Sequence, residues 1–241
     1  MQNNYGMTVS HMKVNTLKKS EILEITGSKK ASLAATVRDQ IQQKITSGEF
    51  KPGDSLIEST LAAELNVSRG PIREATRQLA ETGLLTIIKN RGVFVREVSL
   101  EEALNLCDLR SGLARVAARL AALRATPKQI DQMWQLWEEM EVNREARRSE
   151  DYHDRNDRFH NAIIEASGNM RLLTLHLMTD RELHLFRHWG VIAAKRLDQS
   201  NLEHRTIIEC IEKGDEWGAA LAFEKHVLNG KQRMLDSIGY A

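Results

Sequence analysis

Proline, cysteine and aromatic residues are all scarce in this sequence. Its 241 residues include three prolines, two cysteines and 5% aromatic side chains. Proline interrupts helices, whereas the Ala, Leu, Glu and Arg residues that are plentiful here favour them. The composition therefore predicts a mainly α fold, and a hydrophobic content of 41% is enough for a substantial core.

Disulfide frameworks and membrane-spanning segments are not indicated either. Cys107 and Cys210 lie in amphipathic helical patterns, far apart and outside any C-x-x-C pair. No apolar run approaches the roughly 20 residues that cross a bilayer, and the first residues lack the apolar core of a signal peptide. We expect a cytoplasmic protein with reduced thiols and no membrane partner.

Charge is unevenly distributed along the chain. The net charge is +1 overall, but residues 1–98 carry +4 and residues 99–241 carry −3. A mildly basic first part agrees with a nucleic-acid-binding module that is followed by a module of another kind. Residues 1–31 are polar and lack sustained periodicity, so we expect a flexible amino-terminal extension there.

Residues 32–98 show the pattern of a winged helix-turn-helix. Apolar residues recur at every fourth position at its start, and two shorter amphipathic segments precede a β-prone stretch with a central turn. Ser68 can cap the second short helix, and Gly92 permits a tight turn in the wing. The predicted segments are a helix over 32–48, short helices over 58–66 and 68–83, and a hairpin with its turn at 89–92.

The second short helix carries a row of arginines. Arg69, Arg73 and Arg77 recur at four-residue intervals on one face, while the opposite face is apolar. Arginine makes bidentate contacts with guanine and neutralises phosphates, so such a row suits the DNA major groove. A solvated, salt-bridged helix face would show the same row. The neighbouring turn and wing favour DNA binding.

Residues 99–241 show helical patterns throughout. Ser99 and Glu102 form a capping-box pattern at the start, and glycines or the Thr126-Pro127 step separate the segments. This succession of amphipathic segments predicts an all-α helical bundle as the second domain. The predicted helices cover about 100–125, 127–148, 151–167, 170–189, 200–213 and 215–236.

Three histidines point inward from three of these helices. His160, His204 and His226 each share a helix face with apolar residues. One such histidine is most often a hydrogen-bonded core residue, but three suggest a divalent metal site, and imidazole suits zinc or nickel. Asn156, one turn before His160, can supply a fourth ligand. Three separately hydrogen-bonded core histidines are the alternative. The histidines assigned to packing or to the surface are His176, His184 and His188.

A close resemblance to the winged helix-turn-helix of the GntR family of bacterial transcription regulators lies in SGEFKPGDSLIESTLAAELNVSRGPIREATRQLAETGLLTIIKNRGVFV. It covers about residues 33–96 and implies operator DNA as a partner. Ser59 stands where a subfamily pattern carries a further DNA-contacting arginine, so fewer contacts are expected there. The DNA-binding residues that the resemblance implies are Ser68, Arg69, Arg73, Lys89, Arg91 and Gly92.

A second resemblance lies in LRSGLARVAARLAA, FHNAIIEASGN and EHRTIIECIEKGDEWGAALAFEKHV. The chain from about residue 100 to 230 looks like the helical, effector-binding FCD domain of the FadR subfamily of GntR regulators. The family's metal ligands fall on Asn156, His160, His204 and His226. The first position is often aspartate in the family, so asparagine makes this site less negative and puts the affinity and identity of the metal in doubt.

Together the two resemblances imply a homodimeric, ligand-responsive transcription regulator without catalytic residues. We expect a metabolic repressor on a palindromic operator, whose DNA affinity changes when a small organic acid binds at the metal through its carboxylate. Arg110 is expected to pair with a second carboxylate oxygen. Two alternatives stay open: a helical metallohydrolase that uses the three histidines, and a regulator whose metal is purely structural.

Overall fold

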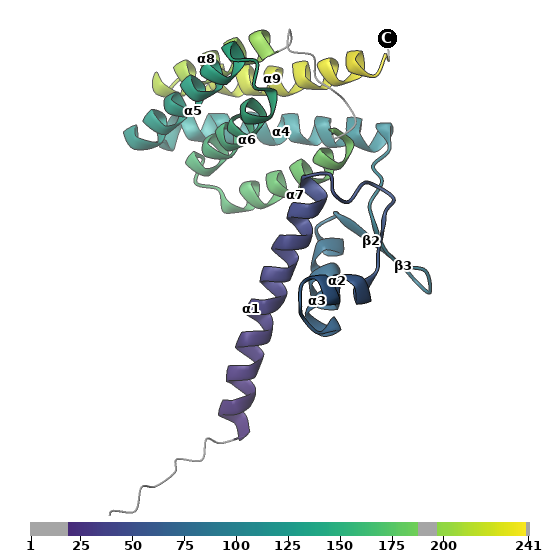
Figure 1. The fold of residues 1–241 in the computed structure, drawn as a ribbon. Helices are drawn as coiled ribbons and strands as arrows, with labels where there is room; N and C mark the ends of the chain where they lie inside the picture. The colour runs from purple at the N-terminus through teal and green to yellow at the C-terminus, as the bar shows by residue number, and fades with distance from the viewer. Residues whose placement is uncertain (1–18, 188–196, 240–241) are drawn as a thin grey trace, which may run out of the picture.

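The computed structural model describes the backbone of residues 19–187 and 197–239, and the side chains of residues 33–148, 151–186 and 197–239. Figure 1 shows a small domain with a β hairpin beneath a bundle of helices, and a long first helix that extends away from both. The small domain is a winged helix-turn-helix and the bundle is all α, so the predicted fold class is confirmed.

The winged domain combines three helices with a small antiparallel sheet. Its elements are α1 (Lys19–Thr46), β1 (Ser55–Leu56), α2 (Glu58–Glu64), α3 (Arg69–Glu81), β2 (Leu85–Ile88) and β3 (Gly92–Val95). The sheet order is β1-β3-β2, with β3 in the centre. Its core draws on every element, and includes Val37, Ile41, Leu56, Leu61, Ile72, Leu79, Leu85, Val93 and Val95.

Helix α1 begins at Lys19, so the predicted helix start at Ser32 is wrong. Starting a helix fixes several residues for one hydrogen bond, whereas extending it gains one hydrogen bond per residue. The turns that pack Val37 and Ile41 in the core therefore allow the helix to continue backward through polar residues. Residues 1–18 of the expected extension lie outside the described residues.

The connections of the winged domain depend on a few special residues. Asn66, between α2 and α3, has a φ of 51°, a left-handed conformation that asparagine tolerates better than most residues. Ser68 precedes α3 with extended backbone but makes no side-chain capping hydrogen bond, so the predicted cap does not form. The hairpin turn forms as predicted, with φ of 61° at Asn90 and 117° at Gly92. Strand β1 was not predicted, because two residues are too few for a periodic pattern.

The helical bundle begins with the predicted capping box. The Ser99 hydroxyl accepts a hydrogen bond from the Glu102 amide at 3.2 Å, and the Glu102 carboxylate accepts one from the Ser99 amide at 3.0 Å. Thr126 and Gln129 form a second box before the next helix. The helices are α4 (Leu100–Arg124), α5 (Pro127–Glu145), α6 (Ser149–Ala166), α7 (Met170–Arg187), α8 (Leu197–Glu212) and α9 (Glu216–Ser237).

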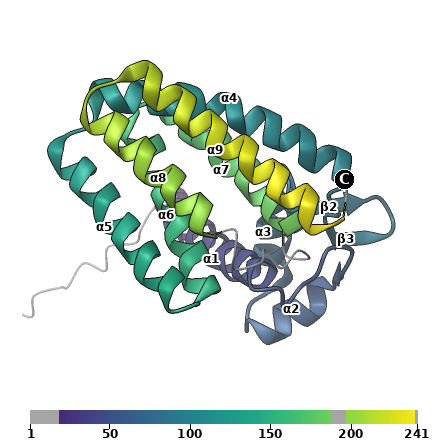
Figure 2. The same cartoon turned by 90° about the horizontal axis from the view of Figure 1, so that it is seen from above.

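Helix α9 lies between α4 and α8, and α5 packs against α6 and α8 (Figure 2). Small residues on α4 allow the close approach of its neighbours, because Ala114, Ala117, Ala118 and Ala121 are all buried. Larger side chains fill the remaining core, and include Met133, Met140, Tyr152, Phe159, Ile163, Ile164, Ile207, Ile208 and Phe223. Across the described ranges no helix has both the length and the apolar character needed to cross a membrane.

Helix α7 connects the bundle to the winged domain. Leu185 is buried in the core of the winged domain. Glu182, one turn earlier, forms an ion pair with Arg96, which follows β3 and also contacts Glu102 at 3.0 Å. His184 Nε2 donates to the Thr46 carbonyl at 3.2 Å at the end of α1. The two domains are therefore held together by apolar packing and polar contacts along one turn of α7.

Candidate metal centre and DNA-binding surface

Helix α3 presents its arginines on the side opposite to its apolar face. Arg69, Arg73 and Arg77 are exposed, whereas Ile72 and Leu79 are buried in the winged domain. The amphipathic pattern of the sequence is therefore realised in the structure. The helix offers a basic surface while its other side holds the domain together.

The three arginines differ in their partners. Arg77 contacts two carboxylates of its own helix, so a salt-bridged helix face describes this residue. Arg73 Nε donates to Glu58 Oε2 of α2 at 2.7 Å, yet the Arg73 side chain stays 67% exposed. Arg69 forms no ion pair with any side chain that the structure describes. Arg69 and Arg73 are thus the arginines of this helix best placed to contact another molecule.

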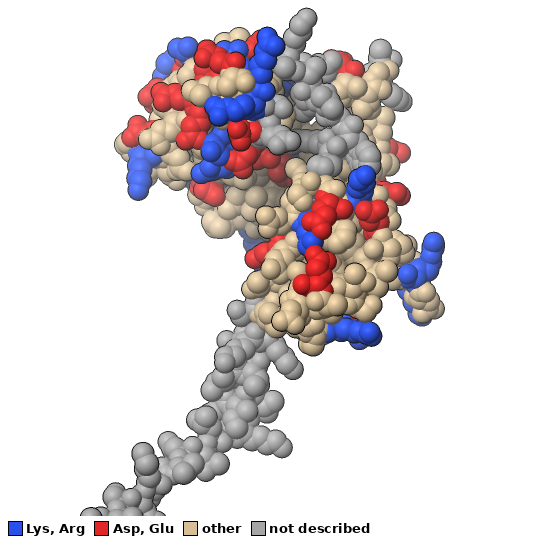
Figure 3. Space-filling model, in the orientation of Figure 1, with Lys and Arg blue, Asp and Glu red and all other residues tan. Residues whose placement is uncertain are grey.

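The wing adds basic side chains beside this helix. Lys89, Arg91 and Gly92 are exposed at the turn between β2 and β3. Figure 3 shows basic side chains at the wing and on the underside of the winged domain, while the bundle carries both signs of charge. A helix and a hairpin that expose basic groups together match the surface by which winged domains contact a DNA groove and its phosphates.

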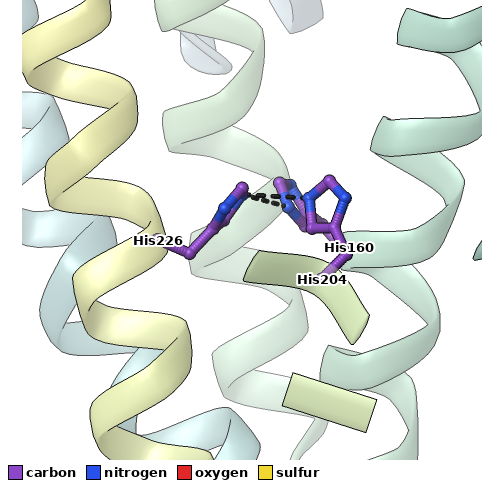
Figure 4. A group of neighbouring side chains, drawn as sticks. All are labelled: His160, His204 and His226. Carbon is purple, nitrogen blue, oxygen red and sulfur yellow. Dashed lines mark hydrogen bonds between the residues drawn. The ribbon is translucent and has the colours of Figure 1, made fainter. Parts of the chain in front are cut away.

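Three buried histidines meet inside the bundle (Figure 4). His160 comes from α6, His204 from α8 and His226 from α9, and the three side chains are at most 5% exposed. His226 Nε2 lies 3.0 Å from His160 Nε2 and 3.1 Å from His204 Nε2. One ligand atom from each residue falls within 4.8 Å of the others. The inward orientation predicted for these residues is therefore correct, and they form a group that could hold one metal ion.

Glu203 orients His226. Its Oε2 accepts a hydrogen bond from His226 Nδ1 at 2.8 Å, so the ring proton of His226 lies on Nδ1 and the Nε2 lone pair points to the other two histidines. Asn229 and Arg233 also donate to this carboxylate, at 2.7 Å and 3.2 Å. A carboxylate behind an imidazole is the usual outer partner of a metal-ligating histidine.

The electrostatics of the cluster favour neutral imidazoles. Burial lowers the pKa of His160 and of His204 well below the usual value, and the neighbouring His226 lowers both further. Burial also lowers the pKa of His226, although Glu203 opposes this effect. Burial alone would raise the pKa of Glu203, but hydrogen bonds from His226 and Arg233 lower it to about 2. The carboxylate is therefore charged and the imidazoles are neutral, which is the form that binds metals.

The distances between the imidazole nitrogens fit a shared metal. With metal–nitrogen bonds of about 2.1 Å, two ligand nitrogens lie about 3.0 Å apart across a right angle and about 3.4 Å apart across a tetrahedral angle. The distances of 3.0 Å and 3.1 Å from His226 Nε2 would suit right angles at a metal between His226 and each of the other two histidines. Three imidazoles at such angles would leave other coordination positions of the metal open. The same distances also suit hydrogen bonds between imidazoles, which would make the three residues hydrogen-bonded core histidines without a metal.

Arg110 contacts the cluster from α4. It is 4% exposed, and its Nη2 lies 3.1 Å from His160 Nδ1 and 3.2 Å from Asp180 Oδ1 of α7. The sequence indicated Arg110 as a contact of the effector, and the structure places it beside the histidines. Asp180, whose position beside Arg110 could not be predicted, carries the balancing charge.

A cavity of about 440 Å³ reaches the cluster. His160, His226 and Arg110 line it, and so does Asn156, whose side-chain amide donates to Asp157 Oδ1 at 3.2 Å. Asn156 thus lies at the cavity one turn before His160, as its position in the sequence suggested. Further lining residues come from both domains, and include Pro52, Glu97, Val98, Tyr152, Lys231 and Arg233.

Sequence reasoning missed the groups that surround the histidines. Glu203 is adjacent to His204 in the sequence but contacts His226, and this contact depends on how α8 and α9 pack. The cavity wall that the winged domain supplies had no sequence signal either. His176 of α7 is buried at 2% exposure, in agreement with its assignment to packing, whereas His188 lies outside the described residues.

Comparison with known families identifies both domains. Residues 33–95 match the model of the gntR family of bacterial regulatory proteins, and residues 105–229 match the model of the FCD domain. The second match covers more than half of the chain. The chain belongs to the GntR family of bacterial regulators and carries an FCD domain.

Individual relatives agree with this assignment. The chain is 33% identical to the Nta operon transcriptional regulator of Aminobacter aminovorans over 70% of its length and 80% of that protein. It is 24% identical to the HTH-type transcriptional repressor GlaR of Escherichia coli over 78% of its length and 89% of that protein. The solved structure of E. coli McbR/YncC shares the fold, with a TM-score of 0.73, 21% identity and coverage of 86% and 98%.

These families and relatives are transcriptional regulators and not enzymes. The protein is therefore a DNA-binding transcriptional regulator with an effector domain, and the metallohydrolase alternative is not supported. Membership of the FadR subfamily stays a prediction, because the matched families do not specify it.

The buried contacts of Glu203 lead to a prediction for metal-free protein. In Glu203→Ala, Arg233 and His226 lose their shared acceptor inside the bundle, and we expect the free energy of unfolding to fall by about 3–5 kcal/mol. The matched control is Glu209→Ala, on the same helix, whose pair with Arg205 is exposed and contributes less than about 1 kcal/mol. Urea unfolding followed by circular dichroism measures both. Equal losses in the two variants would contradict the role given to Glu203.

Proposed function

We propose that this protein is a dimeric repressor that binds a palindromic operator, and that a small organic acid changes its DNA affinity by binding at a divalent metal in the FCD domain. The observation that carries the proposal is the convergence of three buried, neutral histidines at a cavity that is walled by both domains. Repression is inferred from relatives such as GlaR, which is named a repressor.

The DNA-binding part of the proposal assigns α3 to the major groove. Ser68, Arg69 and Arg73 lie at the exposed start of α3 and contact bases or phosphates. In this arrangement Arg73 leaves Glu58 and contacts DNA. The Arg73–Glu58 ion pair lies near the surface, so breaking it costs little free energy. Lys89 and Arg91 reach the adjacent minor groove from the wing, where Gly92 keeps the turn tight.

A dimer is supported by two apolar stripes on the outside of the bundle. Helices α4 and α9 lie side by side, and each exposes large apolar side chains to solvent. The three exposed apolar residues of α4 are spaced seven residues apart, so they lie on one face of the helix. Exposed apolar side chains that gather on neighbouring helices favour an interaction site, and a second copy would bury them around a two-fold axis. The stripe residues are Leu109, Val116, Leu123, Trp217, Leu221 and Leu228.

The metal part of the proposal assigns His160, His204 and His226 as ligands and Asn156 as a further oxygen donor. All four ligands are uncharged, so they leave the charge of a divalent ion uncompensated. Imidazole-rich sites suit zinc or nickel. A bound ion of this kind supplies open coordination positions that attract anionic oxygen ligands.

A carboxylate suits the remaining surroundings of the site. Arg110, Lys231 and Arg233 line the cavity and give it a cationic wall. Each of the three has a carboxylate partner, Glu203 for Arg233, Asp108 for Lys231 and Asp180 for Arg110. Arg110 also contacts His160 at 3.1 Å, so it is placed to hold a ligand bound beside that histidine. A metal held by the histidines would bind one carboxylate oxygen, and the other oxygen would accept from Arg110.

We expect Arg73→Ala to weaken operator binding by about 1–3 kcal/mol, because a base contact is lost while the winged core is untouched. The matched control is Arg205→Ala, which removes another exposed arginine in a glutamate pair, on the bundle. Fluorescence anisotropy on an operator selected from random duplexes, and on a scrambled duplex, measures the effect. Unchanged binding of Arg73→Ala to both duplexes would remove the residue from the interface.

For the dimer, we expect light scattering to give the mass of two chains for the wild type and of one chain for Leu221→Glu, because a buried charge at the interface is unpaired. Leu202→Glu changes an exposed leucine of α8 outside the two stripes and should stay dimeric. A monomeric wild type, or a dimeric Leu221→Glu, would contradict the proposed interface.

We expect one divalent ion per chain, and we expect its affinity to fall at least about tenfold in His204→Ala because a direct ligand is lost. His184→Ala is the control, since that residue contacts the Thr46 carbonyl rather than the cluster. Elemental analysis and titration of metal-free protein with Zn²⁺ or Ni²⁺ measure binding. If metal-free protein binds neither ion, the hydrogen-bonded histidine alternative is correct. Unfolding upon chelation would indicate a purely structural metal.

The proposed carboxylate site predicts that carboxylate binding is linked to metal binding and to operator binding. We expect calorimetric titration with small carboxylates to show affinity for metal-loaded protein and a large loss of it in metal-free and His160→Ala protein. Operator DNA must change that affinity by the factor by which the carboxylate changes operator affinity, because coupling is reciprocal. Equal carboxylate affinity in all three proteins would exclude coordination at the metal. Affinity that is independent of operator would exclude the coupling.

A further inference from the structure

We propose that Arg110 opposes metal binding at His160, so that the metal must displace the guanidinium before all three histidines can act as ligands. The inference rests on the proposed metal site. It assigns to Arg110 a role in regulating the site that is distinct from a simple attraction of anions, and it makes metal and carboxylate binding mutually dependent.

The contact with Arg110 determines which nitrogen of His160 carries the proton. A guanidinium only donates, so at the 3.1 Å contact between Arg110 Nη2 and His160 Nδ1 the imidazole nitrogen accepts. In a neutral imidazole the other nitrogen then carries the proton. His160 Nε2 therefore donates to His226 Nε2 across 3.0 Å. In this arrangement the Nε2 atom of His160 has no lone pair for a metal.

His226 shows the opposite arrangement in the same cluster. Glu203 accepts from His226 Nδ1, so the Nε2 atom of His226 keeps its lone pair and is the acceptor for His160 Nε2. The two histidines thus have outer partners of opposite character. Glu203 favours metal ligation by His226, and Arg110 disfavours metal ligation by His160.

Metal binding through His160 Nε2 moves the ring proton to Nδ1. That N–H would then face the N–H of Arg110, two donors without an acceptor between them. Both side chains are 4% exposed, so bulk water gives little relief, and the positive guanidinium adds repulsion toward the ion. Arg110 must therefore leave the imidazole when the metal binds.

The structure offers Arg110 two acceptors after this displacement. Asp180 of α7 already lies 3.2 Å from Nη2, and the cavity next to Arg110 can admit a carboxylate. A carboxylate that takes the Arg110 donors relieves the conflict at His160, so each ligand raises the affinity of the other. Asp180 lies on the helix that carries Glu182 and Leu185 into contact with the winged domain, so the displaced arginine acts next to the interdomain connection.

Zinc titration of metal-free protein tests the inference with the metal alone. Arg110→Gln removes the charge and offers a carbonyl acceptor to His160 Nδ1, and Arg110→Met removes the charge without an acceptor. We expect Zn²⁺ affinity to rise by about 10–100-fold in Arg110→Gln and by less in Arg110→Met. Arg115→Gln removes a partly exposed arginine of α4 that is paired with Glu224 of α9, and should leave the affinity unchanged.

Side-chain nitrogen NMR of His160 gives a second readout. We expect the proton on Nε2 in metal-free wild type and on Nδ1 after Zn²⁺ binds, and circular dichroism confirms that each variant is folded. Wild-type affinity in both Arg110 variants, or an Nδ1 proton in metal-free wild type, would each overturn the inference. A wild type and variants that all fail to bind Zn²⁺ would instead overturn the proposed metal site.

Discussion

The hydrogen bond from His226 to Glu203 sets the chemistry of the candidate centre. A buried carboxylate needs donors on its oxygens, and Arg233, Asn229 and His226 supply them from α9. This contact fixes the position of the His226 proton and holds α8 against α9. It also directs the His226 Nε2 atom to the point where the rings of His160 and His204 meet. The other two histidines are arranged around an orientation that Glu203 determines.

The same packing connects the centre to the winged domain. Helix α4 brings Arg110 to His160, α7 brings Asp180 to Arg110, and two turns of α7 suffice to span from Asp180 to Leu185 in the winged core. Each contact is short and most of the side chains are buried, so a movement of one group requires a response from the next. The interdomain contacts of Glu182 and His184 lie on this segment and not at a remote loop.

Periodicity made most of the fold predictable, because amphipathic helices place apolar residues at regular intervals. The helix boundaries of the bundle, predicted to within three residues, the capping box at Ser99 and the hairpin turn at Gly92 all depend on local chemistry that the sequence displays. Helix α1 extends further than its apolar pattern, and β1 is stabilised only by pairing with β3, so neither had a local signal.

The histidines of the candidate site were predictable from the sequence, but the groups around them were not. Each inward histidine is marked by the apolar residues of its own helix, so the three could be grouped. Their outer partners could not, because Glu203, Asp180 and the cavity wall at Glu97 depend on packing between elements that are distant in sequence. Arg110 was expected near a ligand, but its contact with His160 Nδ1 appears only when α4 and α6 are placed together.

The position of the cavity explains why this site suits a sensor. A ligand changes a conformational equilibrium only by the difference between its affinities for the two states. A ligand in a pocket enclosed by the bundle alone would have the same contacts however the winged domain were placed. Here Pro52, Glu97 and Val98 line the cavity that also exposes His160 and His226, so part of the wall belongs to the winged domain or its connection. Any rotation of that domain would alter the wall, so under the proposed function the affinity of a ligand in the cavity would depend on the arrangement that DNA selects.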